Sequence, residues 1–375
     1  MATESQQLAL DTIARRPTKG IPTFLIHIMD TDILDELAGV PPGTYLKQPE
    51  ETYLKVLWNV GVNALDQYIP TNPLSMGKHG YESGTAHGAT TGLEEIVLDG
   101  MKIDSPEAVV EHMEKFVFPR TRQSIKDFDE ERTVQNILKG ERDVQQKLGP
   151  SILKTCYGWI PFPGLRYFTY GYANYFMAYA LYPEVMEKDF SLQADYCVLH
   201  NRAAARAIVE GKLAMLYRLD HDMADSRGTL PSIRSLEKIW FPHFERSIRP
   251  VVNTGMNLIW HCDGNLMAMV PLLLEAGIKG FQGFQYEAGM DYEKICKLRA
   301  RDGDTMIIVA GVSVTRTLPF GTPDDVRREM EWLVKCGPRT GLFLAGSSSC
   351  TPSTPRENIL TWIEGLKYYR EHGRG

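Results

Sequence analysis

The carboxyl-terminal third of the chain alternates between short apolar runs and amphipathic segments, and this alternation most constrains the fold. The apolar runs lie at 256–260, 279–284, 305–314 and 341–345, and segments with helical spacing fill the intervals. The run at 305–314, TMIIVAGVSV, is rich in β-branched residues and apolar on both faces, which is typical of a strand covered on both sides. Strands that alternate with helices predict parallel pairing through right-handed crossovers.

Two helix starts in this region carry capping sequences. Thr322, Pro323 and Asp325 occupy the N-cap, N1 and N3 positions of one expected helix. Thr354 and Pro355 repeat the device ahead of the last helix. A hydroxyl at the N-cap, a proline at N1 and a carboxylate at N3 satisfy the free backbone N–H groups of a first turn. We therefore also expect helices over 265–277 and 291–303, which follow two of the apolar runs.

The amino-terminal two thirds are less regular but compatible with the same architecture. We expect strands at 20–29 and 60–69, helices at 50–60, 105–118, 128–149 and 185–212, and a long glycine-rich loop at 70–104. With 375 residues, the length fits one (β/α)8 TIM barrel with an N-terminal extension. We assign 1–104 to that extension, the first barrel elements and the long loop, and 105–375 to the rest of a single structural domain.

Composition excludes several classes of protein. There are 41 Lys and Arg against 47 Asp and Glu, so the net charge of −6 offers no basic face for nucleic acid. No uncharged apolar stretch reaches the ~18 residues that a membrane span needs. The first residues lack the apolar core of a secretory signal, and the six cysteines form no Cys-x-x-Cys pair. We therefore expect a cytoplasmic protein with six reduced thiols.

Polar side chains follow each of the four carboxyl-terminal strands. Parallel barrels collect their functional groups where strands end, so these residues are expected to face one mouth. They are His261, Cys262 and Asp263 after the first strand, Gln285, Tyr286 and Glu287 after the second, Ser313 and Arg316 after the third, and Ser348, Ser349 and Cys350 after the fourth.

His261 and Asp263 alternate on an extended chain, so their side chains point the same way. Such a pair can act as acid and base or bind a metal, with Glu287 as a third ligand. These three residues are our catalytic candidates and our candidate metal ligands. The alternative is a histidine held by its own loop, Asp263 as the N-cap of the next helix, and Glu287 as a solvated loop residue.

Further residues are candidates for binding the substrate. Gln285, Tyr286 and Ser348 lie at strand ends, and Arg316 could hold an anion or form a salt bridge. Asp222 belongs to a second acidic cluster, Asp220-His221-Asp222, after an apolar stretch at 213–219; its alternative role is an ion pair with Arg227. Tyr167 stands for the aromatic segment 157–183, which is either core or the lining of an apolar pocket with hydroxyl groups as polar handles.

The order HCDGNL, EAGIKGFQGFQYEAGMD, IIVAGVSV, LPFGTPDDVRREM, GLFLAGSSS and TPREN resembles the uroporphyrinogen decarboxylase superfamily over about 155–370 and more weakly over 20–70. The resemblance implies a (β/α)8 barrel. It also implies either a porphyrinogen decarboxylase or a methyltransferase that works with a corrinoid protein.

The sequence departs from both well-known branches. The segment KGIPTFLIHIMD lacks the arginines with which the decarboxylase grips its acidic substrate. The coenzyme M methyltransferases hold zinc through His-x-Cys and a later Cys, whereas this chain has His261-x-Asp263 and places Ser348 near the later position, with Cys350 two residues on. The His-x-Asp-Gly version resembles methyltransferase components of O-demethylase systems, and zinc on His261, Asp263 and Glu287 is the expected metal.

The resulting expectation is a methyltransferase that moves a methyl group between a small methylated substrate, such as an aryl methyl ether, and a separate corrinoid protein. The chain has no Asp-x-His-x-x-Gly motif, so cobalamin would arrive on that partner. The alternative is a cofactor-independent decarboxylase or lyase of a small aromatic acid, and a third is a binding protein with a vestigial site. The oligomeric state stays open at this point.

Overall fold

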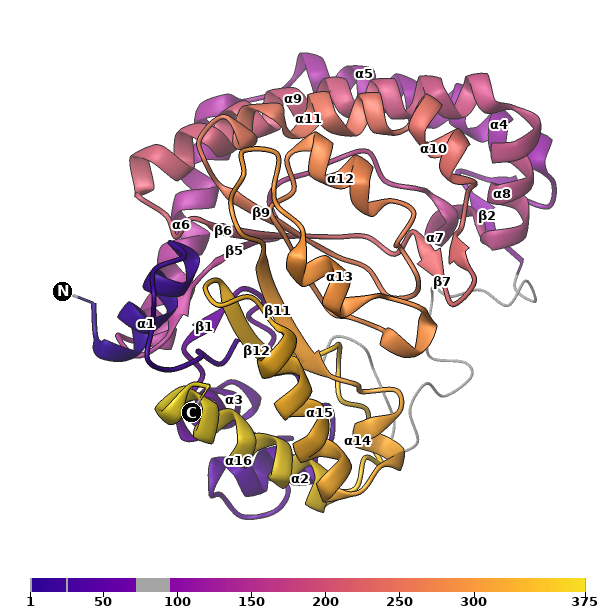
Figure 1. Ribbon diagram of the computed structural model, residues 1–375. Coiled ribbons are helices and arrows are strands. Elements are labelled where there is room, and N and C mark those ends of the chain that lie inside the picture. Colours follow the sequence, from indigo (N-terminus) through magenta and orange to yellow (C-terminus); the bar gives the residue numbers. More distant parts are fainter. Residues whose placement is uncertain (1, 25, 72–94, 375) are drawn as a thin grey trace.

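The computed structural model describes residues 2–24, 26–71 and 95–374, and Figure 1 shows their arrangement. Its strands are β1 Ala64–Leu65, β2 Val97–Leu98, β3 Met101–Lys102, β4 Leu153–Lys154, β5 Cys156–Tyr157, β6 Leu216–Asp220, β7 Ala224–Asp225, β8 Gly228–Thr229, β9 Asn257–His261, β10 Gly280–Gln282, β11 Ile307–Val312 and β12 Leu342–Gly346.

The helices are α1 Glu4–Ile13, α2 Thr31–Ala38, α3 Pro49–Val60, α4 Pro106–His112, α5 Phe118–Lys126, α6 Glu130–Leu148, α7 Tyr167–Tyr170, α8 Tyr172–Leu181, α9 Pro183–Gly211, α10 Ile233–Ile239, α11 Phe241–Val252, α12 Val270–Ala276, α13 Tyr292–Lys297, α14 Thr317–Phe320, α15 Pro323–Cys336 and α16 Arg356–His372. A π-helical turn, Met113–Val117, joins α4 to α5, and a 3₁₀ turn spans Tyr286–Ala288.

Six of the strands form one parallel sheet in the order β12-β11-β10-β9-β6-β5. The four strands expected from the carboxyl-terminal alternation are therefore confirmed as adjacent and parallel. Helices cover the outer side of the sheet, with α9 and α11 on one side of the molecule and α15 and α16 on the other (Figure 1). Among the described residues this sheet has six strands rather than the eight of a closed barrel. Strands β1 and β4 form a separate parallel pair.

The buried strand β11 explains why its sequence is apolar at every position. Ile307 and Val309 belong to a small cluster on the concave side of the sheet, which α1 closes with Ala9 and Ile13. The intervening Ile308 joins the larger core between the sheet and its helices. Burial on both faces removes the polar alternation that a half-exposed strand would show.

The capping predictions hold for one helix start and fail for the other. Thr322 and Asp325 form a complete capping box at the start of α15. Helix α16 instead begins at Arg356 with Pro355 at the N-cap, because the Thr354 hydroxyl donates to the Thr351 carbonyl 2.9 Å away and leaves the first turn of the helix without a side-chain cap.

Two predicted helices are shorter than expected. Residues 265–269 form turns before α12, and the Asn265 side chain accepts a hydrogen bond from the Met267 N–H. After α13 the chain leaves the helix and Arg299 bridges Thr305 in an extended pair. In both places local turn hydrogen bonds compete successfully with the helical ladder. Most of the predicted 70–104 loop lies outside the described residues, apart from the hairpin formed by β2 and β3.

All six cysteines are free and five of them are buried. No described helix combines the length and the apolarity that crossing a bilayer requires.

The close approach of β11 to β12 generates a stability prediction. A Cβ atom on Gly311 would lie 2.1 Å from the Gly346 carbonyl carbon, whereas one on Gly140, in α6, would meet nothing within 4 Å. We expect Gly311→Ala to lower the free energy of unfolding by about 1–3 kcal/mol, because backbone must shift to admit the methyl group. The matched variant Gly140→Ala should raise it by about 0.5–1 kcal/mol. Urea denaturation measures both, and an unchanged midpoint for Gly311→Ala would contradict the packing described.

Candidate active site at the ends of the parallel strands

A polar cavity of about 490 Å³ lies at the carboxyl ends of the parallel strands. Its size is in the range of small-molecule sites. The described residues that line it come from the ends of β6, β9, β10, β11 and β12 and from the chain near residues 24–27 and 67–69. They are Phe24, His27, Gln67, Ile69, Arg218, Asp220, Asp222, His261, Asp263, Gln282, Gln285, Val314, Thr315, Gly346, Ser348, Ser349 and Thr351.

A buried arginine organises one wall of this cavity. Arg218 donates from Nε to Asp66 (2.5 Å), from Nη1 to Asp220 (2.7 Å) and from Nη2 to the Gln67 side chain (3.2 Å). Its guanidinium also lies 4.5 Å from the centre of the Tyr157 ring. Burial acts to lower the pKa of Arg218, but the two carboxylates outweigh burial and raise it. The cation is therefore fully charged and fully partnered.

His261 is held in one orientation by the backbone of the neighbouring strand. Its Nδ1 lies 3.2 Å from the Gln282 carbonyl, which can only accept, so Nδ1 carries the proton. Gly283 makes this contact possible: it has φ +71°, and a Cβ there would lie 2.6 Å from Nδ1. The ring is 7% exposed, and no hydrogen bond to its Nε2 forms among the described residues. Nε2 is therefore available to a ligand.

Two aspartates after β6 lie against His261. Asp222 accepts from the Asp263 backbone N–H at 3.2 Å, and Asp220 accepts from the Tyr157 hydroxyl at 3.1 Å as well as from Arg218. One ligand atom from each of Asp220, Asp222 and His261 lies within 4.8 Å of the others. In the part of the chain that the structure describes, these three residues are the only group of three or more His, Cys, Asp or Glu side chains placed closely enough to hold a metal ion.

Asp263 faces the same cavity with an oxygen that is not satisfied. Its Oδ1 is buried and has no hydrogen-bond partner among the described residues. Burial raises the pKa of the Asp263 carboxyl; His261 opposes this rise, whereas the nearby carboxylates of Asp222 and Asp220 add to it. A carboxyl group of this kind is ready to bind a polar group of a ligand.

The structure does not bring Glu287 into the cavity with His261 and Asp263. Glu287 instead accepts hydrogen bonds from the hydroxyls of Ser313, at 3.0 Å, and Thr315. These hydroxyls come from the loop after β11, so they turn the carboxylate toward that loop. Geometry thus favours Asp220 and Asp222, rather than Asp263 and Glu287, as the companions of His261 in a metal site.

The substrate-binding candidates divide into two groups. Gln285 and Ser348 line the cavity, as Asp222 does, and the Gln285 side chain accepts from the Gly264 N–H at 2.7 Å. Tyr167 lies behind Asp222, because its hydroxyl donates to the Asp222 carbonyl at 2.7 Å. The predicted alternative role for Asp222, an ion pair with Arg227, is wrong, since Arg227 pairs with Asp225 at 2.7 Å.

Two other candidates lie outside the cavity. The Tyr286 hydroxyl donates to the Gly311 carbonyl at 2.7 Å, and its ring packs edge-on against Trp332. Arg316 precedes α14 with an exposed side chain, which forms no ion pair with the described residues. Ser348 and Cys350 are the two alternatives for the rim of the cavity. Ser348 lines the cavity, whereas Cys350 is buried and does not.

Sequence reasoning missed Arg218, Asp66 and His27. A signal for Arg218 was present, because the arginine interrupts the apolar stretch 213–219 and shares a strand face with Asp220, two positions on. No comparable signal marked Asp66 or His27. Both follow short segments near the amino terminus, and only the tertiary fold brings them to the cavity.

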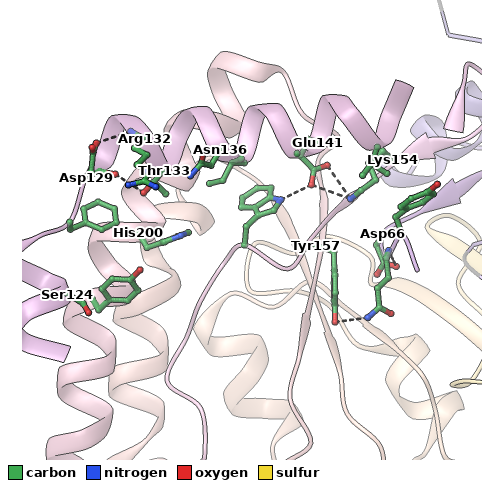
Figure 2. Close-up of a pocket in the computed structure, with 18 of the residues that line it drawn as sticks. Asp66, Ser124, Asp129, Arg132, Thr133, Asn136, Glu141, Lys154, Tyr157 and His200 are labelled. Atoms are coloured by element: carbon green, nitrogen blue, oxygen red, sulfur yellow. Dashed lines mark hydrogen bonds and ion pairs between the residues drawn. The ribbon is translucent and has the colours of Figure 1, made fainter. Parts of the chain in front are cut away.

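A second and larger cavity of about 1260 Å³ adjoins the first, and the two share Gln67 and Ile69 in their linings. It runs along α6 from His200 and Asp129 at one end to Tyr157 and Asp66 at the other (Figure 2). A buried ion pair between Lys154 and Glu141, at 3.3 Å, lies on its wall. Tyr157, whose ring lies over the Arg218 guanidinium, is among the residues that line the wide groove.

Comparison with solved structures shows a known fold. A methyltransferase from Methanosarcina mazei matches with a TM-score of 0.57 at 15% sequence identity, over 97% of this chain and 98% of that chain. A putative vitamin-B12-independent methionine synthase from Listeria monocytogenes matches with a TM-score of 0.37 at 15% identity, over 61% of this chain and 67% of that one, which is too low to bear on the fold. No family model and no curated protein matches the sequence. At this identity the first likeness establishes the α/β fold alone.

The Arg218 network generates a prediction about stability. We expect Arg218→Met to lower the free energy of unfolding by about 3–5 kcal/mol, because it leaves the buried Asp66 carboxylate, and the partly exposed Asp220 carboxylate, without a cation. Arg206→Met, which removes an exposed arginine that pairs with Glu130, should leave stability nearly unchanged. Thermal and urea unfolding of both variants provide the measurement, and equal stability of the two would refute the proposed importance of the network.

His27 generates a pH prediction. Burial, and then the charge of Arg218, lower its pKa from an ordinary value of 6.5 to about 4, and its Nδ1 lies 2.7 Å from the Ser349 hydroxyl. The unfolded chain therefore binds this proton more readily, so stability is fully present above about pH 6.5 and is lost as the pH falls toward about 4. His27→Gln should flatten the pH dependence of the unfolding free energy over this window. A slope identical to that of the unmutated protein would contradict the assignment.

Proposed function

We propose that the protein transfers a methyl group between a small methylated substrate, such as an aryl methyl ether, and a separate corrinoid protein. The observation that carries the proposal is the polar cavity in which the free Nε2 of His261 and the unpartnered Oδ1 of Asp263 face the ligand. The fold shared with a methyltransferase supports the general class. The sequence resemblance supports the corrinoid partner.

The chemistry explains why such a cavity is needed. When a methyl carbon leaves an ether oxygen, the carbon–oxygen bond breaks and its electron pair stays on oxygen. That oxygen is a poor leaving group unless a proton or a Lewis acid takes up the charge. The corrinoid of the partner would supply the nucleophile that accepts the methyl group. A proton carried by the Asp263 carboxyl, whose pKa is raised by burial, or a Lewis acid bound through Nε2 of His261, would take up the charge of the leaving oxygen. Gln282, whose buried Oε1 has no partner among the described residues, would orient the rest of the substrate.

The two adjoining cavities support a reaction with two reactants. The smaller one has room for a single-ring substrate, whereas the larger one exceeds the usual ~300–1,000 Å³ of a small-molecule site. A methyl acceptor must approach the methyl carbon on the side opposite the leaving oxygen. The wide groove beside Gln67 offers that approach without displacing the bound substrate.

The charges around the small cavity weigh against the alternative, a decarboxylase of a small aromatic acid. A bound carboxylate would face Asp220, Asp222 and Asp263. Among the described lining residues, Arg218 is the only lysine or arginine. Asp66 and Asp220 already neutralise its charge. An acidic substrate would thus meet net negative charge, whereas a neutral ether would not.

We further infer that the sheet closes into the eight-stranded barrel of this architecture, with 1–104 and 105–375 as parts of one domain. Residues 22–24 would supply a strand between β12 and β1. In support, the Phe24 N–H donates to the Leu344 carbonyl at 2.8 Å, the Leu344 N–H donates to the Pro22 carbonyl at 3.0 Å, and the Asn63 N–H donates to the Thr23 carbonyl at 2.9 Å. A cytoplasmic location belongs to the same proposal and draws support from the six free thiols.

The functional prediction is tested by incubating the protein with cob(I)alamin and a panel of methoxyarenes while recording the visible spectrum of methylcobalamin. We expect substrate-dependent methylation. His261→Ala should slow it by roughly 10²–10⁴-fold, the range for loss of a residue that assists proton or charge transfer. Asp195→Asn, on the far surface and paired with Arg246, should keep the full rate.

Two results would overturn this assignment. One is the release of carbon dioxide from aromatic acids in the absence of corrinoid, which would establish the decarboxylase. The other is methylation that His261→Ala leaves at the full rate, which would place the chemistry elsewhere in the protein.

A further inference from the structure

We propose that Asp220, Asp222 and His261 bind one divalent metal ion with mixed nitrogen and oxygen ligands. The inference rests on the proposed function only in one respect, because the ion would lie where the leaving oxygen is expected. Its binding to the protein requires neither substrate nor corrinoid. It also replaces the ligand set expected from the sequence, since Glu287 is engaged by the hydroxyls of the loop after β11.

The three side chains are placed to bind one ion, and neighbouring groups hold them in position. One ligand atom of each lies within 4.8 Å of the others, so a single ion can touch all three after a small adjustment of rotamers. Hydrogen bonds hold both aspartates: Asp220 accepts from Arg218, and Asp222 accepts from the backbone N–H of Asp263. Outer contacts of this kind orient metal ligands in known sites.

His261 provides the independent sign of a ligand. The ring is more than nine-tenths buried and borders the cavity. Its Nδ1 donates to the Gln282 carbonyl at 3.2 Å, which leaves the lone pair of Nε2 without a partner among the described residues. A histidine that donates through one nitrogen to a backbone carbonyl is in the tautomer that binds metal through the other.

The charge of the cluster also calls for a cation. Four carboxylates, those of Asp66, Asp220, Asp222 and Asp263, border or contact this side of the cavity, against the single positive charge of Arg218. Asp66 is buried, and Asp222 and Asp263 are half-buried. Carboxylates crowded together in such excess are costly unless they are paired, protonated or bound to metal. A divalent ion between Asp220, Asp222 and His261 would remove most of the imbalance.

The ligands indicate the kind of metal. Two carboxylates and an imidazole suit Zn²⁺, Co²⁺, Mn²⁺ or Fe²⁺. They do not suit a soft ion such as Cu⁺, which prefers thiolate ligands. The Cys262 thiol does not compete, because its side chain is buried, donates to the Asp263 carbonyl and accepts from the Met223 N–H. Three protein ligands leave at least one position open, as in catalytic sites, and a substrate ether oxygen can occupy it.

The test uses the full-length protein, purified without a metal-affinity tag and depleted of metal with a chelator that is then removed. Titration with Zn²⁺ is followed by calorimetry, and titration with Co²⁺ by the visible absorption of the bound ion. We expect saturable binding of one ion per chain for both metals. Elemental analysis after gel filtration gives an independent count.

Substitutions locate the ion. Asp222→Asn and His261→Gln preserve side-chain size and should weaken Zn²⁺ and Co²⁺ binding by more than about 100-fold, beyond the 10–100-fold effect of losing an outer contact. Asp225→Asn alters a nearby carboxylate that pairs with Arg227 and should bind both metals normally. Circular dichroism of each variant confirms that it is folded.

Three outcomes would overturn the inference. They are no saturable binding to the folded protein, binding that survives both Asp222→Asn and His261→Gln, and binding that is lost in Glu287→Gln but kept in Asp222→Asn. These outcomes are separate from those that test methyl transfer. Metal-depleted protein that still methylates cobalamin at the full rate would refute a role of the ion at the leaving oxygen and keep the proposed function. Stoichiometric metal in a protein without methyl transfer would keep the metal site and refute the proposed function.

Discussion

The ion network around Arg218 is the interaction on which the site depends. A guanidinium buried at the end of β6 is tolerable only if carboxylates approach it, and they come from the chain after β1, through Asp66, and from β6 itself, through Asp220. The network therefore ties the chain after β1 to β6, which lies next to β5 at one edge of the six-stranded sheet. It also fixes one oxygen of Asp220, so that the other end of the carboxylate is left for whatever the cavity binds.

The carboxyl-terminal half of the fold could be predicted because its physical signals are local. Strand β11 is buried on both faces and therefore lacks any polar alternation, and α15 begins with a complete capping box. Each of these signals arises within about ten residues of chain. Their order along the sequence then restricts the topology to parallel neighbours, and this is the arrangement of β9 to β12.

The amino-terminal half and the composition of the site resisted prediction for a different reason. Strands β1 and β4 are two residues long, so no periodicity can announce them. The rule that polar groups gather at strand ends predicted that His261 and Asp263 border one cavity, and both line it. The rule could not tell that Glu287 would accept hydrogen bonds from Ser313 and Thr315 instead. The direction of a side chain in a loop depends on partners from other loops, which a single sequence does not reveal.

The presence of carboxylates rather than thiols at this mouth has a chemical consequence under the proposals made above. A thiolate-bound zinc is a soft centre suited to activating sulfur, whereas an ion on Asp220, Asp222 and His261 would be harder and would prefer oxygen. A methyl group carried on oxygen leaves an oxygen anion behind, and a hard ion stabilises that anion directly. The same carboxylates repel an acidic substrate. The excess of carboxylates at the cavity thus favours both the proposed metal ion, which they would bind, and the proposed neutral ether, which they would not repel.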